Sequence, residues 1–461
     1  MQEKLQVLKT KLAEIAAINE AAALLAWDMR TNMPAGGAEA RSEQMAVLGE
    51  IAQVKFIAPE IGTLLQDLKA AGFDPDSDEA RLIDNASRDY DQATRVPVEF
   101  VGEMGRSVAL AQEAWVRARQ ESNFSIFAPH MEKLMELGQR YISFFPPADH
   151  PYDVLLNEYE PGMKTADVKA IFDALRPQQV ELLKQIASRP QVDDSFLHQP
   201  FDEQAQLDFG SKVVTAFGYD WTQGRQDKTA HPFTISIGQG DVRITTRVYP
   251  EFLNPALFGT MHEAGHAMYE QGVNPAYKRT SLAHGASLAI HESQSRMWEN
   301  LVGRSLPFWQ CFYPDLQKAF PAQFGNLPLE TFYKGINKVQ PSLIRVEADE
   351  ATYNLHIMLR LEIEIALVEG KIAVKDLPEY WNSKMQEYLG VTPPNDAQGV
   401  LQDIHWSQGS LGYFSTYALG NLVSAQLWEK INREIPDLPE QIRKGEFGAL
   451  LGWLRKNVHQ F

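Results

Sequence analysis

The feature that most constrains the fold of this chain is a helical repeat of apolar residues along most of its 461 residues. Near the start, Leu5, Leu8 and Leu12 recur at intervals of three and four, which places their side chains on one face of an α-helix. Further stripes of this kind cover residues 79–92, 98–120, 127–144, 165–188 and 203–217. The sequence therefore predicts a mainly α-helical protein.

Clusters of proline and glycine interrupt the helical stripes and predict the turns between helices. They lie at residues 34–37, 146–151, 161–162, 393–395 and 436–439. No internal repeat or low-complexity segment divides the chain. We expect a single domain over residues 1–461, with a helical front half (1–225) and a second half (226–461) that contains a hairpin and a candidate metal site, both described below.

One segment departs from the helical period. Residues 234–237 and 242–248 are rich in β-branched side chains, and Gly238-Gln239-Gly240-Asp241 between them is typical of a turn. The sequence predicts a β-hairpin here, just before the motif described next. An edge strand beside that motif could hold an extended peptide by main-chain hydrogen bonds. A hairpin that only covers the core fits the same residues.

Residues 262–266 read His-Glu-Ala-Gly-His, the HExxH pattern. Histidines four residues apart lie one helical turn apart, so both imidazoles can bind one Zn²⁺ ion. Glu263 between them can then act as a general base on a metal-activated water. We expect the helix to begin at Asn254-Pro255 and to end at Gly272.

A catalytic zinc ion needs a third protein ligand. The extended metzincin motif would require glycine at 269 and histidine at 272, and Tyr269 and Gly272 exclude that class. A carboxylate on the next predicted helix, residues 286–302, is the remaining option. Glu292 and Glu299 are both candidates, and we favour Glu292.

Charge and cysteine content limit the partners and the compartment. The 43 basic and 60 acidic residues give a net charge of −17, which disfavours nucleic acid and anionic membranes as partners. A single cysteine, Cys311, excludes an internal disulfide framework. The polar N-terminus does not resemble a signal peptide, and no apolar run reaches membrane length. We therefore expect a cytoplasmic protein.

Several short motifs follow one another along the second half of the chain. In chain order they are His231-Pro232-Phe233 (HPF), Asp241 to Thr245 (DxRxT), His262 to His266 (HExxH), His291 to Ser293 (HES), Ile344 to Asp349 (IRxxAD) and Gly399 to Trp406 (GxxQDxHW). These motifs resemble those of one enzyme family, the M32 or Taq carboxypeptidase family. Trp27-Asp28 and residues 158–162 also resemble segments of that family, so the resemblance covers essentially the whole chain.

The resemblance implies a helical fold with a long deep groove, related to the oligopeptidase-like gluzincins. It implies release of single amino acids from peptide C-termini with broad specificity, and commonly a homodimer. It also implies one divalent metal ion per chain, Zn²⁺ with Co²⁺ able to substitute, and two histidines and a glutamate would accept Mn²⁺ as well. The alternatives are an oligopeptidase that cuts internal bonds with the same metal site, and a catalytically inactive helical binding protein.

The motifs also identify candidate functional residues around the metal. Arg345, with Arg243 beside it, is our candidate for binding the substrate carboxylate through a bidentate guanidinium. An internal ion pair, for example between Arg345 and Asp349, is the structural alternative.

By analogy with related gluzincins, His405 and Tyr417 are candidate hydrogen-bond donors to the developing oxyanion. Tyr413 is the reserve candidate for the same task. His231 and Asp241 are expected to shape the groove. We expect Asp403 to orient His405 or a metal-binding histidine.

Overall fold

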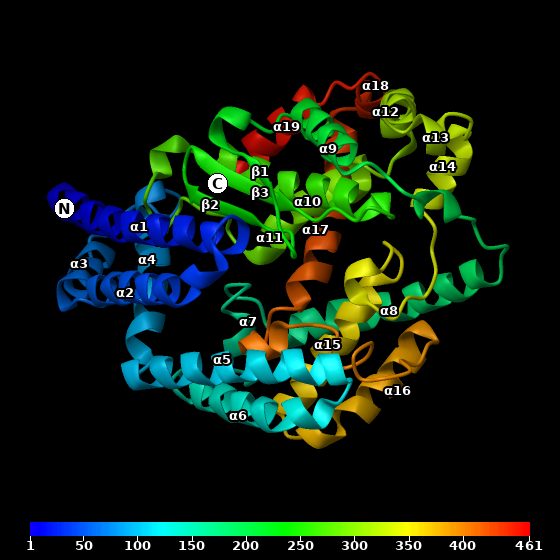
Figure 1. Ribbon diagram of the computed structural model, residues 1–461. Helices are drawn as coiled ribbons and strands as arrows, with labels where there is room; N and C mark the ends of the chain where they lie inside the picture. Colours follow the sequence, from blue (N-terminus) through cyan, green and yellow to red (C-terminus); the bar gives the residue numbers. More distant parts are fainter.

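The computed structural model describes residues 1–461 and is mainly helical (Figure 1). The five helical stripes predicted beyond the first correspond to α4, α5, α6, α8 and α9, so the fold class is confirmed. The front helices are α1 (Gln2–Thr31), α2 (Ala38–Phe56), α3 (Pro59–Lys69), α4 (Asp78–Arg95), α5 (Val98–Glu121), α6 (Phe124–Ser143), α7 (Tyr152–Leu156), α8 (Thr165–Ala187) and α9 (Glu203–Phe217). The later helices are α10 (Leu253–Gly272), α11 (Leu288–Arg296), α12 (Leu306–Ala319), α13 (Pro321–Phe324), α14 (Leu329–Ile336), α15 (Tyr353–Val368), α16 (Leu377–Leu389), α17 (Ser415–Glu434), α18 (Leu438–Arg443) and α19 (Gly448–Leu454).

The apolar side chains form two large cores and one small one. Helices α5–α8, α15 and α16 pack around one large core, which is the lower body in Figure 1. Helices α9, α10, α12, α18 and α19 pack around the other, which is the upper body, while α1–α4 enclose the small core at one side. Both large cores draw on residues from before and after residue 225, so the two halves of the sequence interleave in space.

A three-stranded sheet in the order β1-β3-β2 lies beside α10. β2 (Thr234–Gly238) and β3 (Asp241–Thr246) are antiparallel and form the predicted hairpin, with Thr234 opposite Ile244. The third strand, β1 (Gln226–Lys228), runs parallel to β3 and was not predicted, because its three polar residues carry no alternating pattern. β2 is an edge strand, and it faces the helix that carries the HExxH motif.

The two helices of the predicted metal site differ in detail from the expectation. α10 begins at Leu253, with Phe252 at the capping position, so Asn254 is not the N-cap. α10 ends at Gly272, as predicted. The segment expected as one helix over 286–302 is α-helical only from Leu288 to Arg296 and continues as a π-helix from Met297 to Val302.

α11 is clamped between α10 and α17 by two close approaches at glycine. A Cβ atom at Gly265 would lie 2.6 Å from the Cα atom of Ser295 on α11. A Cβ atom at Gly420 on α17 would lie 2.7 Å from the Cβ atom of Glu292. Both contacts are too short for a side chain, so glycine at these two positions sets the spacing of the three helices.

A second π-helical turn, Arg455–His459, packs behind α10 and α11. The buried His459 ring lies 5.1 Å from that of Tyr269, and its Nε2 is 3.0 Å from Oε1 of Gln294. His459 thus has a structural role in the packing behind α10 and α11.

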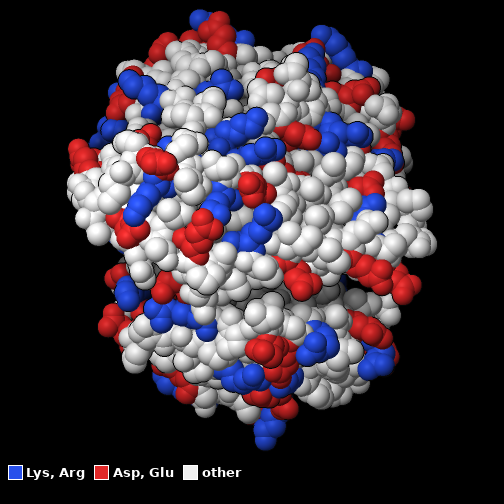
Figure 2. All heavy atoms as spheres, turned by 90° about the vertical axis from the view of Figure 1, so that its left-hand side faces the viewer, with Lys and Arg blue, Asp and Glu red and all other residues white.

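The surface mixes both signs of charge. On the face shown in Figure 2, basic and acidic side chains are interspersed, and a crevice crosses the lower third of the molecule. None of the helices combines the length and the apolar character that crossing a bilayer requires.

Candidate metal centre

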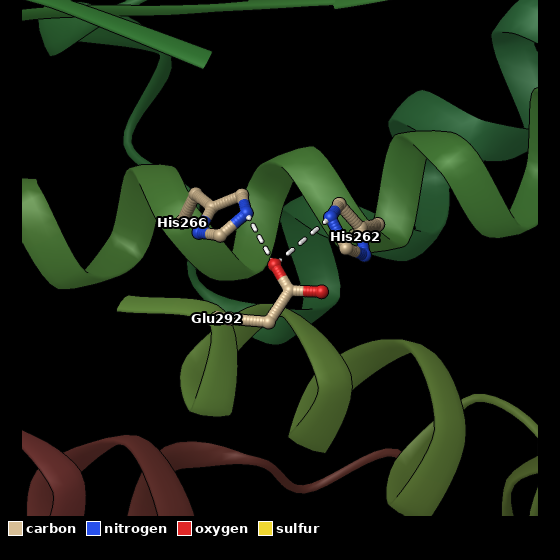
Figure 3. A group of neighbouring side chains, drawn as sticks. All are labelled: His262, His266 and Glu292. Atoms are coloured by element: carbon tan, nitrogen blue, oxygen red, sulfur yellow. Dashed lines mark ion pairs between the residues drawn. The ribbon is translucent and has the colours of Figure 1, made fainter. Parts of the chain in front are cut away.

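Two histidines from α10 and one glutamate from α11 converge on a common point (Figure 3). Oε2 of Glu292 lies 3.6 Å from Nε2 of His262 and 3.3 Å from Nε2 of His266. The ligand atoms of a tetrahedral zinc site with bonds of about 2.0–2.1 Å are separated by about 3.4 Å. The three side chains therefore fit a divalent ion, and the choice of these three residues from the sequence agrees with their placement.

The outer nitrogens of both histidines have their own partners. Nδ1 of His262 is 2.9 Å from Oε2 of Glu299, and Nδ1 of His266 is 3.1 Å from the main-chain oxygen of His291. Such contacts orient imidazoles and leave Nε2 free to bind a metal. Glu299, the second candidate ligand, thus supports His262 from behind and lies in the π-helical turn that follows Arg296.

Arg296 holds the candidate ligand Glu292 as a carboxylate. Its Nε donates to Oε1 of Glu292 at 2.7 Å, and one of its terminal nitrogens donates to Oε2 of Glu299 at 3.1 Å. Burial raises the pKa of Glu292, but Arg296 and the two histidines outweigh burial and hold that pKa well below its usual range. Sequence reasoning missed Arg296, although its position four residues after Glu292 on one helix was a usable signal.

Glu263 is buried beside these groups and receives a hydrogen bond from the sheet. Oγ1 of Thr234 on β2 lies 2.7 Å from Oε2 of Glu263 and 2.8 Å from its main-chain oxygen. Burial raises the pKa of Glu263, with His262 and Thr234 acting in the opposite direction. β2 therefore positions the glutamate of the HExxH motif, a role that the sequence assigned to no residue of the hairpin.

His405, Tyr413 and Tyr417 form an aromatic cluster. Nε2 of His405 is 3.3 Å from the hydroxyl of Tyr417, and the ring of Tyr413 lies 5.2 and 5.3 Å from those of His405 and Tyr417. Tyr417 lies one turn before Gly420, the residue that touches Glu292, so the cluster adjoins the metal centre.

Burial keeps this cluster uncharged near neutral pH. It lowers the pKa of His405 to about 4, with Arg345 acting in the same direction. It also raises the pKa of Tyr417 well above its usual range, assisted by Tyr413. Both groups can therefore act as neutral hydrogen-bond partners.

Arg345 is buried in a closed ionic network. Its Nε and one terminal nitrogen donate to Oδ1 of Asp403 at 3.0 and 2.8 Å, and its other terminal nitrogen donates to the hydroxyl of Tyr353 at 2.8 Å. Asp403 also accepts a 2.7 Å hydrogen bond from Nε of Arg360. Arg345 thus takes part in an internal ion pair, with Asp403 in place of Asp349.

The role expected of Asp403 was wrong. Both of its carboxylate oxygens are occupied by arginines, and Nδ1 of His405 has no hydrogen-bond partner. The metal-site histidines are supported by Glu299 and His291 instead. Asp403 instead pairs with Arg345 and Arg360, which carry the opposite charge. The linear sequence does not show that these arginines lie near Asp403.

Arg243 and Asp241 form a separate pair at the sheet. Two 2.7 Å hydrogen bonds join the guanidinium to the carboxylate, and the guanidinium lies 4.2 Å above the ring of Trp27. Arg243 and Arg345 have different hydrogen-bond partners. His231 is exposed in the loop before β2, and the nearby Arg247 and Arg119 add to partial burial in lowering its pKa.

A polar cavity of about 260 Å³ adjoins the metal centre. Arg296 and Glu299 line this cavity and also contact the candidate ligands Glu292 and His262. Arg304 and Glu350 also line it, so its wall carries both signs of charge.

The chain matches the family model described as carboxypeptidase Taq (M32) metallopeptidase over residues 7–461. It belongs to the M32 family. It is 42% identical to thermostable carboxypeptidase 1 of Thermus thermophilus over 458 residues, which cover 97% of this chain and 90% of that one. Among solved structures, the M32 carboxypeptidase of Deinococcus radiodurans superposes with a TM-score of 0.95 at 40% identity, covering 99% of this chain and 92% of the other. The Pyrococcus furiosus carboxypeptidase superposes with a TM-score of 0.96 at 37% identity, covering 100% and 93%.

Membership of the M32 family makes this protein a metal-dependent carboxypeptidase that acts on peptides. The family implies a metal ion, and the group of His262, His266 and Glu292 is suited to hold one.

Proposed function

We propose that this M32 enzyme releases single amino acids from peptide C-termini with broad specificity. The observation that carries the proposal is the convergence of two imidazole nitrogens and one carboxylate oxygen beside the buried Glu263. His262, His266 and Glu292 would hold one Zn²⁺ ion per chain, and Co²⁺ or Mn²⁺ would suit the same ligands. When bound, such an ion activates water and polarises the scissile carbonyl.

Glu263 moves the proton in this proposal. It accepts a proton from the attacking water at its carboxylate and returns it to the leaving amine. The contact from Thr234 keeps the carboxylate oriented, and burial, by raising its pKa, makes it a stronger base than an exposed glutamate.

Tyr417 and His405 would stabilise the negative charge that develops on the carbonyl oxygen. The uncharged state of both side chains and their place beside α11 support this role. Tyr413, which is packed against both, is the reserve donor.

For the substrate's terminal carboxylate we retain Arg345 and Arg243 as proposed ligands. Each has N–H groups beyond those engaged by its aspartate. The side chain of Arg243 is the more accessible, at 16% exposed against 5% for Arg345. Asp241 fixes the orientation of Arg243, and His231 would line the groove near it.

The mixed charges of the cavity beside the metal centre support broad specificity. A wall that contains Arg296, Arg304, Glu299 and Glu350 favours neither acidic nor basic side chains alone.

Paired peptides test the proposal. A peptide with a free C-terminus should lose one residue at a time, and the same peptide with a C-terminal amide should be stable, as followed by mass spectrometry. Equal cleavage of both would instead support an oligopeptidase that cuts internal bonds. A Glu263→Gln variant should release nothing from either peptide above background.

We also propose a cytoplasmic homodimer. The single cysteine suits a reducing compartment. Val47, Ile51 and Val54 on α2 are exposed and spaced along one helical face, an apolar stripe that a second copy would cover. Sedimentation of an Ile51→Glu variant should show a monomer where the parent protein is a dimer.

A further inference from the structure

The two candidate metal-binding histidines are supported in different ways. His262 meets the carboxylate of Glu299 directly at 2.9 Å. Nδ1 of His266 instead lies 2.7 Å from Nδ1 of His291, and Nε2 of His291 lies 2.9 Å from Oε1 of Glu270. Glu270 is buried on α10, one turn beyond His266. A second imidazole thus stands between His266 and its carboxylate.

The chemistry of these contacts fixes the direction of each hydrogen bond. An ionised carboxylate only accepts, so Nε2 of His291 must carry the hydrogen that faces Glu270. Nδ1 of a neutral His291 is then an acceptor. The hydrogen between the two imidazoles must therefore sit on Nδ1 of His266, where the main-chain oxygen of His291 at 3.1 Å can share it.

We propose that Glu270 and His291 are positioning residues that hold His266 in the tautomer required for metal binding. With hydrogen on Nδ1, the lone pair of His266 is on Nε2, the atom that faces Glu292. The opposite tautomer of His291 would direct a lone pair at the carboxylate of Glu270 and a hydrogen at His266. Glu270 thus acts on His266 only through His291. This inference rests on the metal site proposed above.

A purely structural role for Glu270 makes a different prediction. If Glu270 only stabilises the fold, its neutralisation would lower the free energy of unfolding and leave the metal affinity of the folded protein unchanged. The dissociation constant for Zn²⁺, measured on folded metal-free protein by competition with a chelator, therefore separates the two roles.

The first variant is Glu270→Gln, which keeps the shape of the side chain and permits either tautomer of His291. We expect Zn²⁺ to bind about 10–100-fold more weakly than to the parent protein. The matched control is Glu364→Gln, since Glu364 is also a buried carboxylate but accepts from Tyr152, Trp406 and Gly412, away from the metal centre. Equal Zn²⁺ affinity of the Glu270→Gln variant and the parent would overturn the proposal.

A double-mutant cycle tests whether Glu270 acts through His291. His291→Phe preserves the ring packing against Tyr269, at 5.1 Å, and removes the relay. Combined with Glu270→Gln, it should bind Zn²⁺ no more weakly than His291→Phe alone. Additive losses would contradict a relay, and if His291→Phe does not fold, the comparison of Glu270→Gln with Glu364→Gln decides.

A His266→Ala variant separates failure of this inference from failure of the proposed site. Parental Zn²⁺ affinity in that variant would refute His266 as a ligand. Loss of Zn²⁺ binding there, with unchanged affinity in Glu270→Gln, would overturn the relay alone.

Discussion

The metal centre and the Arg345 network are both buried clusters of charge, but they are organised in opposite ways. At the metal centre, Nε2 of His262, Nε2 of His266 and Oε2 of Glu292 point toward one common position. Around Asp403, each carboxylate oxygen already receives a hydrogen bond from an arginine. The first cluster directs three metal-binding atoms at one position, and in the second each carboxylate oxygen is paired with an arginine. This difference distinguishes a binding site from a structural ion pair better than burial does.

The comparison predicts its largest effect at Glu292. Glu292→Gln removes the only anionic ligand of the candidate site and leaves Arg296 with Glu299 as its remaining carboxylate partner. We expect loss of bound metal and of peptide hydrolysis to background, measured by metal analysis after dialysis and by amino-acid release. Full metal content in this variant would show that the convergence in Figure 3 is not the binding site.

Glu263→Gln should lower the rate of peptide hydrolysis without changing metal binding. Its carboxylate faces Thr234 and is not among the three converging groups. We expect kcat to fall by about 10²–10⁴-fold, with metal content equal to that of the parent protein. A variant that kept its kcat would require another general base.

Tyr417→Phe tests a residue that lies between the metal centre and the Arg345 network. The hydroxyl contacts His405, while the ring lies 4.9 Å from the guanidinium of Arg345. We expect kcat to fall by about 10²–10³-fold with little change in KM, and Tyr413→Phe to have the smaller effect. The reverse order would make Tyr413 the oxyanion donor.

Asp403→Asn should affect the fold rather than the metal. Removing one partner of a buried ion pair costs about 3–5 kcal/mol, here because two arginines lose their counter-charge. Chemical denaturation should show this loss, while metal affinity remains that of the parent. Weakened metal binding without loss of stability would mean that the two clusters are coupled.

Acid should destabilise the protein, for two reasons that add. Arg345 and Arg360 outweigh burial and hold the pKa of Asp403 well below its usual range, so its stabilisation is present above about pH 3.9 and is lost as the pH falls through the lower folded value. Burial lowers the pKa of His405 to about 4. As the pH falls from about 6.5 towards that value, His405 binds a proton in the unfolded chain but not in the folded chain, so the folded state loses stability.

Denaturation midpoints between pH 7 and 4 should therefore fall. They should fall less steeply in a His405→Gln variant, because the contribution of Asp403 is lost only below about pH 3.9 and His405 is the one of the two that acts in this range. An unchanged slope in that variant would mean that His405 does not titrate as described.

The sequence located the candidate metal ligands because they depend on local spacing. His262 and His266 are one turn apart on a single helix, and Glu292 is on the next helix of the chain. The hairpin was predicted for the same reason, since its strands are neighbours in sequence.

The partners of these residues could not be predicted in the same way. Thr234 meets Glu263 across 29 positions, and Arg345 meets Asp403 across 58. Only the packing of helices against one another brings such pairs into contact. The π-helical turn that carries Glu299 to His262 likewise has no periodic signature in the sequence.

The support of the metal helices by His459 has a consequence for biosynthesis. His459 is added roughly 190 residues after His266, which at about 5–20 residues per second takes on the order of 10–40 s. During that interval a nascent chain already contains both metal-binding histidines but lacks the residues that pack beneath Gln294. The packing beneath Gln294 on α11 is therefore complete only after His459 has been translated.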